Sequence, residues 1–404
     1  MAPAIRPTIK TDAPLQNREK RKLDGQTGRI KVVFVIDNMR LGGTELNAVR
    51  TAERLDRERF DLRVVCLGED GPLTKRYRAM GVPVENMPIH SFYGSSMVRS
   101  GRKFVSMLRR ERIDIVHAHD VYSNIFSAVW TRMGGVPVLI TSRRWWNSLP
   151  NWKLKLGSRF AVARSTAVLA NSNSVATQVI SEAAAAKGKV WTITNFVEPH
   201  AFGAPDDEER QRLRAGWNAP DDAVVIGCVA RFDPIKDHAG LIRAFAILHA
   251  QQPHTYLVLM GDGQTRPTAE ALVNELGLST CVHFTGEQHT RTNLHRGLDI
   301  SVLSSLSEGF PNSLVEAMAA GNPVVATAVG GSVDAVVEEQ TGLLVPSGEP
   351  DALAKALFRL TESAGTRVAF GRAGERRALE VFDASIVVSS LEHMYLQLLE
   401  GREQ

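Results

Sequence analysis

The stretch from Glu308 to Glu316 has the most distinct chemical character in the chain and reads Glu-Gly-Phe-Pro-Asn-Ser-Leu-Val-Glu. Pro311 cannot lie deep inside a helix, because it lacks a backbone N–H and its ring clashes with the preceding turn. We therefore expect Glu308 on a loop and Glu316 in the first turn of a helix over Ser313–Ala320. The N-terminus of such a helix can bind phosphate, while the flanking carboxylates can accept hydrogen bonds from hydroxyls. A nucleotide sugar would satisfy both requirements.

A purely structural interpretation of the same residues also stands. Ser313 and Glu316 have the spacing of a capping box, in which the two side chains satisfy free N–H groups of the first helical turn. From this stretch alone the two interpretations are about equally supported.

Two cations follow a predicted strand in the second half of the chain. Arg231 and Lys236 come directly after the apolar run Val224–Val229. Arginine offers a planar fork of donors and lysine a mobile point charge, so the pair could clamp a diphosphate. The alternative is a solvated loop whose cations pair with Asp233 and Asp237.

Glycines recur at the ends of predicted strands. They are Gly42 and Gly43, Gly261 and Gly263, and Gly330 and Gly331. Glycine lets the backbone approach a ligand closely, although many such turns use it only for geometry. The repetition at one kind of position indicates a ligand site better than any single turn does.

His117 and His119 stand at the end of another predicted strand, where alternate side chains share a face. A metal site is disfavoured, because no further Cys, His or carboxylate cluster lies nearby in the sequence. We expect one histidine to contact a substrate hydroxyl and the other to pack, and a purely structural pair is the alternative.

Residues 143–159 combine three of the six tryptophans with five basic residues. Aromatic rings with basic flanks suit a bilayer interface or a sugar-stacking surface, and a covered corner of the core is the alternative. Nucleic acid is disfavoured as a partner, because no helix-turn-helix, RNA-binding sheet or zinc signature accompanies the charge.

The composition is that of a globular protein long enough for two domains. The chain has 404 residues, of which 44% are hydrophobic and 23% charged. Its three cysteines are far apart and suggest reduced, buried thiols. No run of eighteen apolar residues and no apolar signal core is present, which predicts a cytoplasmic protein.

The net charge of +4 hides an asymmetry between the two halves. Residues 29–190 contain 26 Lys and Arg against 13 Asp and Glu, whereas residues 191–404 contain 16 against 28. The basic half could contact an anionic partner such as a membrane surface, or the opposite charges could help the halves dock.

Strand and helix patterns alternate twice along the chain, which predicts two doubly wound α/β domains. We expect a disordered basic tail over 1–28, a first domain over 29–200 and a second over 201–384, with a polar linker at Pro205–Arg214. A helix over 385–404 is expected to pack back on the first domain. Ligands in such sheets bind beyond the carboxyl ends of the strands, so a site in a cleft between the domains is predicted.

The motifs in this order resemble the retaining glycosyltransferases with the GT-B fold, family 4, also called glycosyl transferases group 1. The resemblance extends over nearly all of residues 30–400. It rests on Gly42-Gly43-Thr-Glu, Asp114-Ile-Val-His-Ala-His-Asp120, Asn171-Ser172-x-Ser174, Ile193-Thr-Asn195-Phe-Val197, Arg231 with Lys236, Gly261-Asp-Gly263, the 308–316 stretch, Gly321-x-Pro323, Gly330-Gly331 and Thr341-Gly-Leu-Leu-Val345. The family's usual Asn-Gly-Val-Asp appears here as Asn195-Phe-Val-Glu198, and Asp334 replaces a glutamate after the paired glycines.

The resemblance implies roles for these residues. Catalysis would involve Glu308 and His119 at the donor sugar, with Arg231 and Lys236 neutralising the leaving diphosphate. Glu316 would bind the ribose hydroxyls. The remaining donor-binding residues implied are Gly42, Gly43, Gly261, Gly309, Phe310, Pro311, Asn312, Ser313 and Leu314. Neither a metal nor a cofactor is implied, and the donor would be a nucleotide-diphosphate sugar, with UDP favoured over GDP.

The implied activity is transfer of a hexosyl-type sugar, with retention, to a lipid-linked or polysaccharide acceptor in cell-surface glycan synthesis. The enzyme would be cytoplasmic and could contact the inner face of an anionic plasma membrane through its basic domain. The alternatives are a GT-B sugar-nucleotide epimerase or phosphorylase, and a non-catalytic sugar-nucleotide-binding partner. Acid/base or pyridoxal-phosphate signatures for the former are absent from the sequence.

Overall fold

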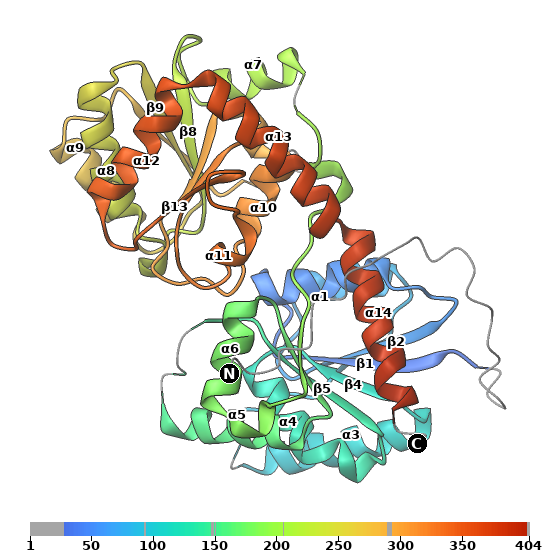
Figure 1. Cartoon of the computed structure of the whole chain (residues 1–404). Helices are drawn as coiled ribbons and strands as arrows, with labels where there is room; N and C mark the ends of the chain where they lie inside the picture. The colour runs from blue at the N-terminus through green and yellow to red at the C-terminus, as the bar shows by residue number, and fades with distance from the viewer. Residues whose placement is uncertain are drawn as a thin grey trace. The chain divides into compact units, whose positions relative to one another are not determined.

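The computed structural model describes residues 28–92, 94–146, 149, 151–204, 206–288 and 293–401. The chain forms two compact units (Figure 1). The first comprises the residues up to Thr194 together with the segment from Val388 onward, and the second is Asn195–Val387. The tail expected over residues 1–28 lies outside the described residues, apart from Gly28.

The first unit is built on a seven-stranded sheet in the order β3-β2-β1-β4-β5-β6-β7, in which neighbouring strands are parallel. The strands are β1 (Ile30–Ile36), β2 (Phe60–Cys66), β3 (Val84–Asn86), β4 (Ile115–Ala118), β5 (Val138–Arg143), β6 (Ala167–Ala170) and β7 (Val190–Thr192).

Helices cover both faces of this sheet, which explains why its central strand reads as an unbroken apolar run. In β1, Val32 and Phe34 belong to one hydrophobic core, and the intervening Val33 and Val35 belong to another. Because successive side chains point to opposite faces, every residue of such a strand must be apolar. The helical segments are α1 (Gly43–Arg54), α2 (Pro72–Ala79), α3 (Ser95–Glu111), α4 (Val121–Trp130), η1 (Arg132–Gly134), α5 (Trp152–Arg164), α6 (Asn173–Glu182) and η2 (Ala184–Ala186).

The last helix, α14 (Ala384–Glu400), contributes to the core of the first unit although it follows the second in sequence. Leu391, Met394 and Tyr395 are buried in the same core as β1 and β2. The Tyr395 ring lies edge-on to Phe60, with ring centroids 5.8 Å apart.

The second unit is built on a six-stranded parallel sheet in the order β10-β9-β8-β11-β12-β13. Its strands are β8 (Val224–Val229), β9 (Thr255–Met260), β10 (Val282–Gly286), β11 (Ile300–Leu303), β12 (Val324–Thr327) and β13 (Gly342–Val345). Its helical segments are η3 (Pro199–Ala201), α7 (Asp207–Gly216), η4 (Pro234–Lys236), α8 (His238–Gln251), α9 (Arg266–Glu275), η5 (Leu294–Gly297), α10 (Asn312–Ala319), α11 (Ser332–Ala335), α12 (Pro350–Glu362) and α13 (Ala364–Val381).

The predicted class, two doubly wound α/β domains, is confirmed, and three local predictions need correction. Strand β3 and helix α13 were not expected from the sequence pattern. The polar segment expected as a linker is largely helix α7, and Pro205 lies outside the described residues. The α7 residue Arg214 is buried and donates to Asp299 Oδ2 at 2.6 Å, so this polar helix is anchored to the unit by a charge pair.

Within the described ranges, no helix is both long and apolar enough to cross a bilayer.

Candidate active site

A buried ion pair joins two of the predicted catalytic residues of the second unit. The Nζ of Lys236 lies 2.5 Å from Oε1 of Glu308, and the two side chains are 21% and 8% exposed. Oε1 also accepts a hydrogen bond of 2.6 Å from the Ser305 hydroxyl. The carboxylate is therefore fixed by a cation and a hydroxyl that come from the ends of two neighbouring strands.

Further hydrogen bonds hold these two strand ends together. The loop after β8 carries η4, and its Ile235 carbonyl accepts from the N–H of Leu306 at 2.8 Å. The Ser304 hydroxyl donates to the Lys236 carbonyl at 2.9 Å. Because β8 and β11 are adjacent and parallel, their carboxyl ends meet, and the loops they carry can share these bonds.

The paired glycines after β12 pack directly on the loop of Glu308. The N–H of Gly331 donates to the Glu308 carbonyl at 3.2 Å. A Cβ at Gly331 would lie 2.4 Å from the Gly309 carbonyl oxygen, far inside van der Waals contact. Position 331 must therefore be glycine, because a side chain would collide with the backbone at Gly309. The close contact of Gly331 positions the loop that carries Glu308.

The start of α10 corrects the capping prediction. The helix begins at Asn312 with Pro311 at the N-cap position, and among the described residues no side chain makes a cap hydrogen bond there. Ser313 is therefore inside the helix, so the capping-box interpretation is wrong. Glu316 falls at the fifth helical residue, one turn beyond the start, and not in the first turn as expected. The N–H of Leu314 donates to the Pro311 carbonyl at 3.1 Å, whereas those of Asn312 and Ser313 have no partner among the described residues and are available to an anion.

The other predicted residues of this stretch differ in burial: the side chains of Phe310 and Leu314 are buried, whereas those of Asn312 and Glu316 are partly exposed. Phe310 is buried with its ring edge-on to Phe382, at 5.6 Å between centroids, and Leu314 is 1% exposed. Both side chains pack in the hydrophobic core of the unit, so we assign any ligand contact of these two residues to their backbone. Asn312 is oriented by Asn195, whose Nδ2 donates to its Oδ1 at 2.8 Å. The side chain of Glu316 is partly exposed.

Arg231 is the most exposed of the predicted site residues in this unit. Its side chain is 71% exposed and lies 3.6 Å from the Asp233 carboxylate, the partner considered in the solvated-loop alternative. Gly261 supports the same loop, because its φ is +140° and a Cβ there would lie 2.2 Å from the Ala230 carbonyl oxygen. Gly261 therefore packs against the loop that carries Arg231, and this contact explains why position 261 is glycine.

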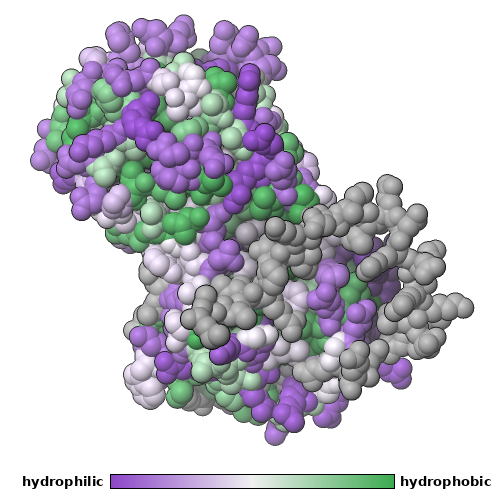
Figure 2. Space-filling model, in the orientation of Figure 1, coloured by the Kyte–Doolittle hydropathy of each residue, from purple (hydrophilic) through white to green (hydrophobic). Residues whose placement is uncertain are grey.

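Apolar surface borders this charged site. Leu306, two residues before Glu308, is 46% exposed, and Val333 of α11 is 44% exposed. Figure 2 shows hydrophobic residues gathered on the part of the second unit where Figure 1 places β13 and α11, whereas its outer rim is hydrophilic. A site with a few fixed polar groups beside apolar surface can bind the face of a sugar or a base.

The two predicted histidines of the first unit have different environments. Both rings are buried and stack at 4.2 Å between centroids. The Nδ1 of His117 lies 2.7 Å from the Tyr395 hydroxyl and its Nε2 lies 2.8 Å from the Ser142 hydroxyl, so both its nitrogens are satisfied. Neither ring nitrogen of His119 has a partner among the described residues. Burial lowers the pKa of His119 well below its usual value, so the ring is neutral and can both donate and accept.

The paired glycines of the first unit are not equivalent. A Cβ at Gly42 would lie 2.3 Å from Oε2 of Glu45, a side chain that folds back over the start of α1 and accepts from Asn38 at 2.8 Å. A Cβ at Gly43 would meet no described atom within 4 Å, so this residue alone leaves open space. Of the pair, Gly43 is the residue that a ligand could approach.

Two carboxylates near His119 were not singled out from the sequence. Asp37 follows β1 and accepts hydrogen bonds from the N–H groups of Ser123 and Tyr122, at 2.6 and 3.1 Å, at the start of α4. Asp120 caps the same helix by accepting from Val121 at 2.7 Å. Burial, with a further contribution from Asp120, raises the pKa of Asp37 to about 7. The available signal was a carboxylate directly after a buried strand, the same signal that identified the histidines.

Comparison with known proteins agrees with this arrangement. The family model "Glycosyltransferase Family 4" matches residues 41–201, and the model "Glycosyl transferases group 1" matches residues 209–377. EpsF of Bacillus subtilis, named as a glycosyltransferase, is 28% identical over 76% of this chain and 81% of its own length. The D-inositol 3-phosphate glycosyltransferase of Salinispora arenicola is 30% identical over 70% of this chain and 68% of its own.

Other relatives are matched over a shorter share of their length. Four further D-inositol 3-phosphate glycosyltransferases are 28–34% identical, and the chain spans 50–56% of each of them. Among solved structures, Anabaena HepE in complex with UDP superposes with a TM-score of 0.82 at 22% identity, covering 91% of this chain and all of that one. Both family models, the relatives matched over more than two thirds of their length and the shared two-domain architecture lead to one conclusion: the chain belongs to the glycosyltransferases with the GT-B fold.

Proposed function

We propose that this protein is a retaining glycosyltransferase that moves a sugar from a UDP-sugar to an acceptor hydroxyl. The observation that supports this best is the ion pair between Lys236, in η4 after β8, and Glu308, on the loop that leads into the start of α10, where no described side chain caps the helix. The Lys236 ammonium, the Glu308 carboxylate and the N–H groups at the start of α10 all lie after the carboxyl ends of the neighbouring strands β8 and β11. This set matches a sugar diphosphate, with negative charge at one end and hydroxyls at the other.

The second unit binds the donor in this proposal. The N–H groups at the start of α10 and the ammonium of Lys236 bind the diphosphate. Glu308 occupies one of the three donors of that ammonium, which leaves two for phosphate oxygens. Arg231, being exposed, can swing onto the diphosphate, and Glu316 accepts hydrogen bonds from the ribose hydroxyls.

The reaction breaks the bond between the anomeric carbon and the diphosphate oxygen, which departs with the electron pair. The acceptor oxygen forms the new bond on the same face of the sugar, through an oxocarbenium-like state. The acceptor proton passes to an oxygen of the leaving diphosphate. Lys236, Arg231 and the helix start stabilise the charge that develops on that diphosphate, while Glu308 orients the sugar and is not a nucleophile.

His119 of the first unit is proposed to contact a hydroxyl of the donor sugar. The support is its pair of buried ring nitrogens without partners among the described residues, because an unsatisfied buried polar group is costly unless a ligand completes it. His117 has its hydrogen bonds completed by Tyr395 and Ser142 and serves to hold the neighbouring ring.

The preference for UDP is supported by similar structures, since HepE was solved with UDP and with UDP-glucose. The acceptor is proposed to be a lipid-linked or polysaccharide glycan at the cell surface. In support, a lipopolysaccharide outer core galactosyltransferase, WaaB, superposes with a TM-score of 0.70.

The direct test incubates the purified protein with UDP-, GDP- and ADP-sugars and measures binding and nucleotide release. Binding of a UDP-sugar with slow release of UDP is expected, and NMR of the released or transferred sugar should show retained anomeric configuration. Chelation of divalent metals should leave the rate unchanged, because protein cations supply the charge. Absence of binding to any nucleotide sugar would contradict the proposal, and binding without turnover with any acceptor would favour a non-catalytic partner.

A further inference from the structure

Helix α5 of the first unit carries three exposed apolar side chains on one face. Trp152 is 69% exposed, Leu156 60% and Phe160 42%. They are spaced four residues apart, so they form one stripe along the helix surface. We call these three residues the 152–156–160 stripe.

The opposite face of α5 is packed into the unit, so the stripe is not the result of a loosely attached helix. Ala161 and Val162 belong to two of the hydrophobic cores. A Cβ at Gly157 would lie 2.7 Å from Ile125 Cδ1, which shows that α5 lies directly on α4. The helix is therefore apolar on two faces, of which the first unit covers one.

Cations flank the stripe on both sides. By helical geometry, Lys155 and Arg159 lie along one edge, and Lys153 and Arg164, three turns apart, lie along the other. The Nζ of Lys153 lies 5.8 Å from the Trp152 ring centroid and the guanidinium of Arg164 lies 5.9 Å from that of Phe160.

The surrounding segment carries no compensating negative charge. Residues 121–181 contain seven Lys and Arg and no Asp or Glu. The first acidic residue after them is Glu182, whose carboxylate is 2.9 Å from Arg143 Nη1. All charged side chains of the sequence segment that contains the stripe are therefore positive.

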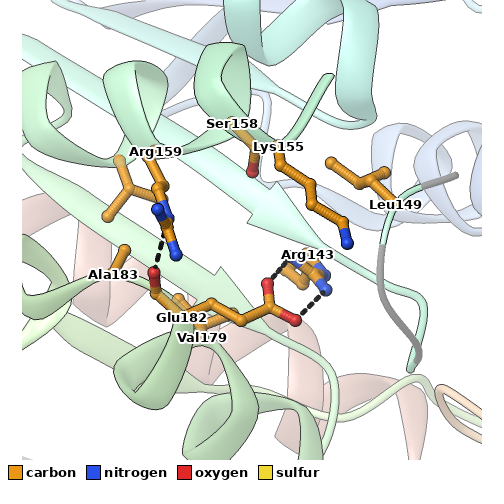
Figure 3. A pocket seen from close by; sticks show the side chains of 9 residues that line it. Arg143, Leu149, Lys155, Ser158, Arg159, Val179, Glu182 and Ala183 are labelled. Carbon is orange, nitrogen blue, oxygen red and sulfur yellow. Dashed lines mark hydrogen bonds and ion pairs between the residues drawn. The ribbon is translucent and has the colours of Figure 1, made fainter. Parts of the chain in front are cut away.

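A small basic cavity adjoins the Lys155–Arg159 edge. It has a volume of about 130 Å³ and is lined by Arg143, Lys155, Arg159 and Glu182 with neighbouring residues. Figure 3 shows Lys155 extending toward Arg143, while Glu182 interacts with Arg143 and Arg159. Among the described residues, no acceptor pairs with the Lys155 ammonium, so three cations face one carboxylate there.

We propose that α5 docks the protein on an anionic phospholipid membrane. In this arrangement Trp152, Leu156 and Phe160 enter the boundary between headgroups and acyl chains. The flanking cations contact lipid phosphates, and Lys155 brings one such phosphate to the mouth of the basic cavity. Aromatic and aliphatic side chains flanked by Lys and Arg are the composition of interfacial helices, which bind by apolar burial together with attraction to anionic lipid.

Charge and area argue against a second copy as the occupant. A symmetric dimer places the same patch of both subunits face to face, so the cation rows would oppose one another. Three side chains also bury only about 500 Å² per partner, below the roughly 800 Å² of a stable protein interface. The docking does not depend on the glycosyltransferase activity proposed above.

The structure separates the three tryptophans that the sequence pattern grouped together. Of the three tryptophans in residues 143–159, only Trp152 is fully on the surface, whereas Trp145 and Trp146 are half-buried. Trp145 is stacked by the guanidinium of Arg143, 4.6 Å from its ring centroid. Leu156 and Phe160 take the place that the sequence pattern assigned to those two rings.

The test is cosedimentation of the full chain with phosphatidylglycerol–phosphatidylcholine vesicles and with phosphatidylcholine vesicles alone. We expect binding to the anionic vesicles that weakens with salt. The variant Trp152→Ser/Leu156→Ser/Phe160→Ser should bind at least about tenfold more weakly, and Lys155→Gln about fivefold. Val368→Ser is the matched control, because Val368 is 52% exposed on α13 of the second unit.

Three results would overturn the proposal. One is unchanged vesicle binding by the triple variant when its melting temperature matches the native chain. Another is equal binding to neutral and anionic vesicles. The third is absence of vesicle binding, with light scattering showing a dimer that the triple variant abolishes. UDP-sugar binding by the triple variant should equal that of the native chain, so failure of this proposal is distinguishable from failure of the proposed function.

Discussion

Replacing Lys236 by methionine should separate the structural role of the Lys236–Glu308 pair from its proposed catalytic role. Glu308 is 7% exposed and its Oε1 has two partners, Lys236 at 2.5 Å and the Ser305 hydroxyl at 2.6 Å. Removing one partner of a buried ion pair costs about 3–5 kcal/mol, because the other charge is left unpaired. Since Ser305 remains and Lys236 is itself 21% exposed, we expect the free energy of unfolding to fall by about 2–3 kcal/mol.

The double variant Lys236→Met/Glu308→Gln should recover most of this loss. A glutamine retains an acceptor for the Ser305 hydroxyl and carries no charge, so no buried ion is left without a partner. The coupling energy of the double-mutant cycle is then expected to be about 2 kcal/mol. Activity should not recover, because the cation that neutralises the leaving diphosphate is still absent, and kcat should stay about a hundredfold or more below that of the native enzyme.

Stability and kcat can be measured on the four proteins of the cycle, which are the native chain, Lys236→Met, Glu308→Gln and the double variant. Thermal unfolding should show a melting temperature lowered by about 5–10 °C in Lys236→Met, since 1 kcal/mol corresponds to about 2–4 °C for a unit of this size. UDP release from a UDP-sugar gives kcat. The reasoning is refuted if Lys236→Met is as stable as the native protein, or if the double variant is no more stable than the single one.

Three further predictions address the remaining site residues. Glu316→Ala should mainly raise the Kd of the UDP-sugar, about tenfold, whereas Arg231→Ala should mainly lower kcat; the reverse pattern in titration and kinetics would contradict their roles. Gly331→Ala should lower kcat and the melting temperature together, because the added Cβ would meet the Gly309 carbonyl at 2.4 Å. The pKa of Asp37 is raised to about 7, so the folded protein keeps this carboxyl protonated at a pH where the unfolded chain has lost the proton. The free energy of unfolding of the native chain should therefore fall relative to that of Asp37→Asn as the pH rises from about 4 through 7, by at most about 4 kcal/mol. Melting temperatures of the two proteins that change in parallel across that range would disprove this.

The sequence by itself was enough to predict the architecture and to place the candidate site residues at the ends of buried strands. Apolar runs such as Val32–Val35 can be buried on both faces only in a parallel sheet covered by helices, and the structure shows this burial. Because the carboxyl ends of parallel strands share one edge, residues that follow those runs were expected to be functional. Lys236 and Glu308 follow β8 and β11 and do lie together.

The tertiary structure decided which residues are partners, because the relevant contacts join distant parts of the chain. Lys236 and Glu308 are 72 residues apart, and His117 is satisfied by Tyr395, 278 residues away. Nothing local distinguishes His117 from His119. The positions of α14 and β5 supply partners to the His117 ring and leave the His119 ring without one among the described residues. A local pattern records which side chains could be buried or charged, whereas pairing and exposure depend on what the fold places against them.

The 308–316 stretch and α5 show the same limit. Local spacing made Ser313 a plausible cap, yet the helix begins at Asn312, whose side chain accepts a hydrogen bond from Asn195, 117 residues away. In α5 the sequence shows apolar residues on both faces, and only the packing of Gly157 on Ile125 determines which face is covered and which is exposed. The sequence determined the fold class and the edge of each sheet where the candidate site residues lie, and the packing of distant elements determined which of those side chains are paired, buried or exposed.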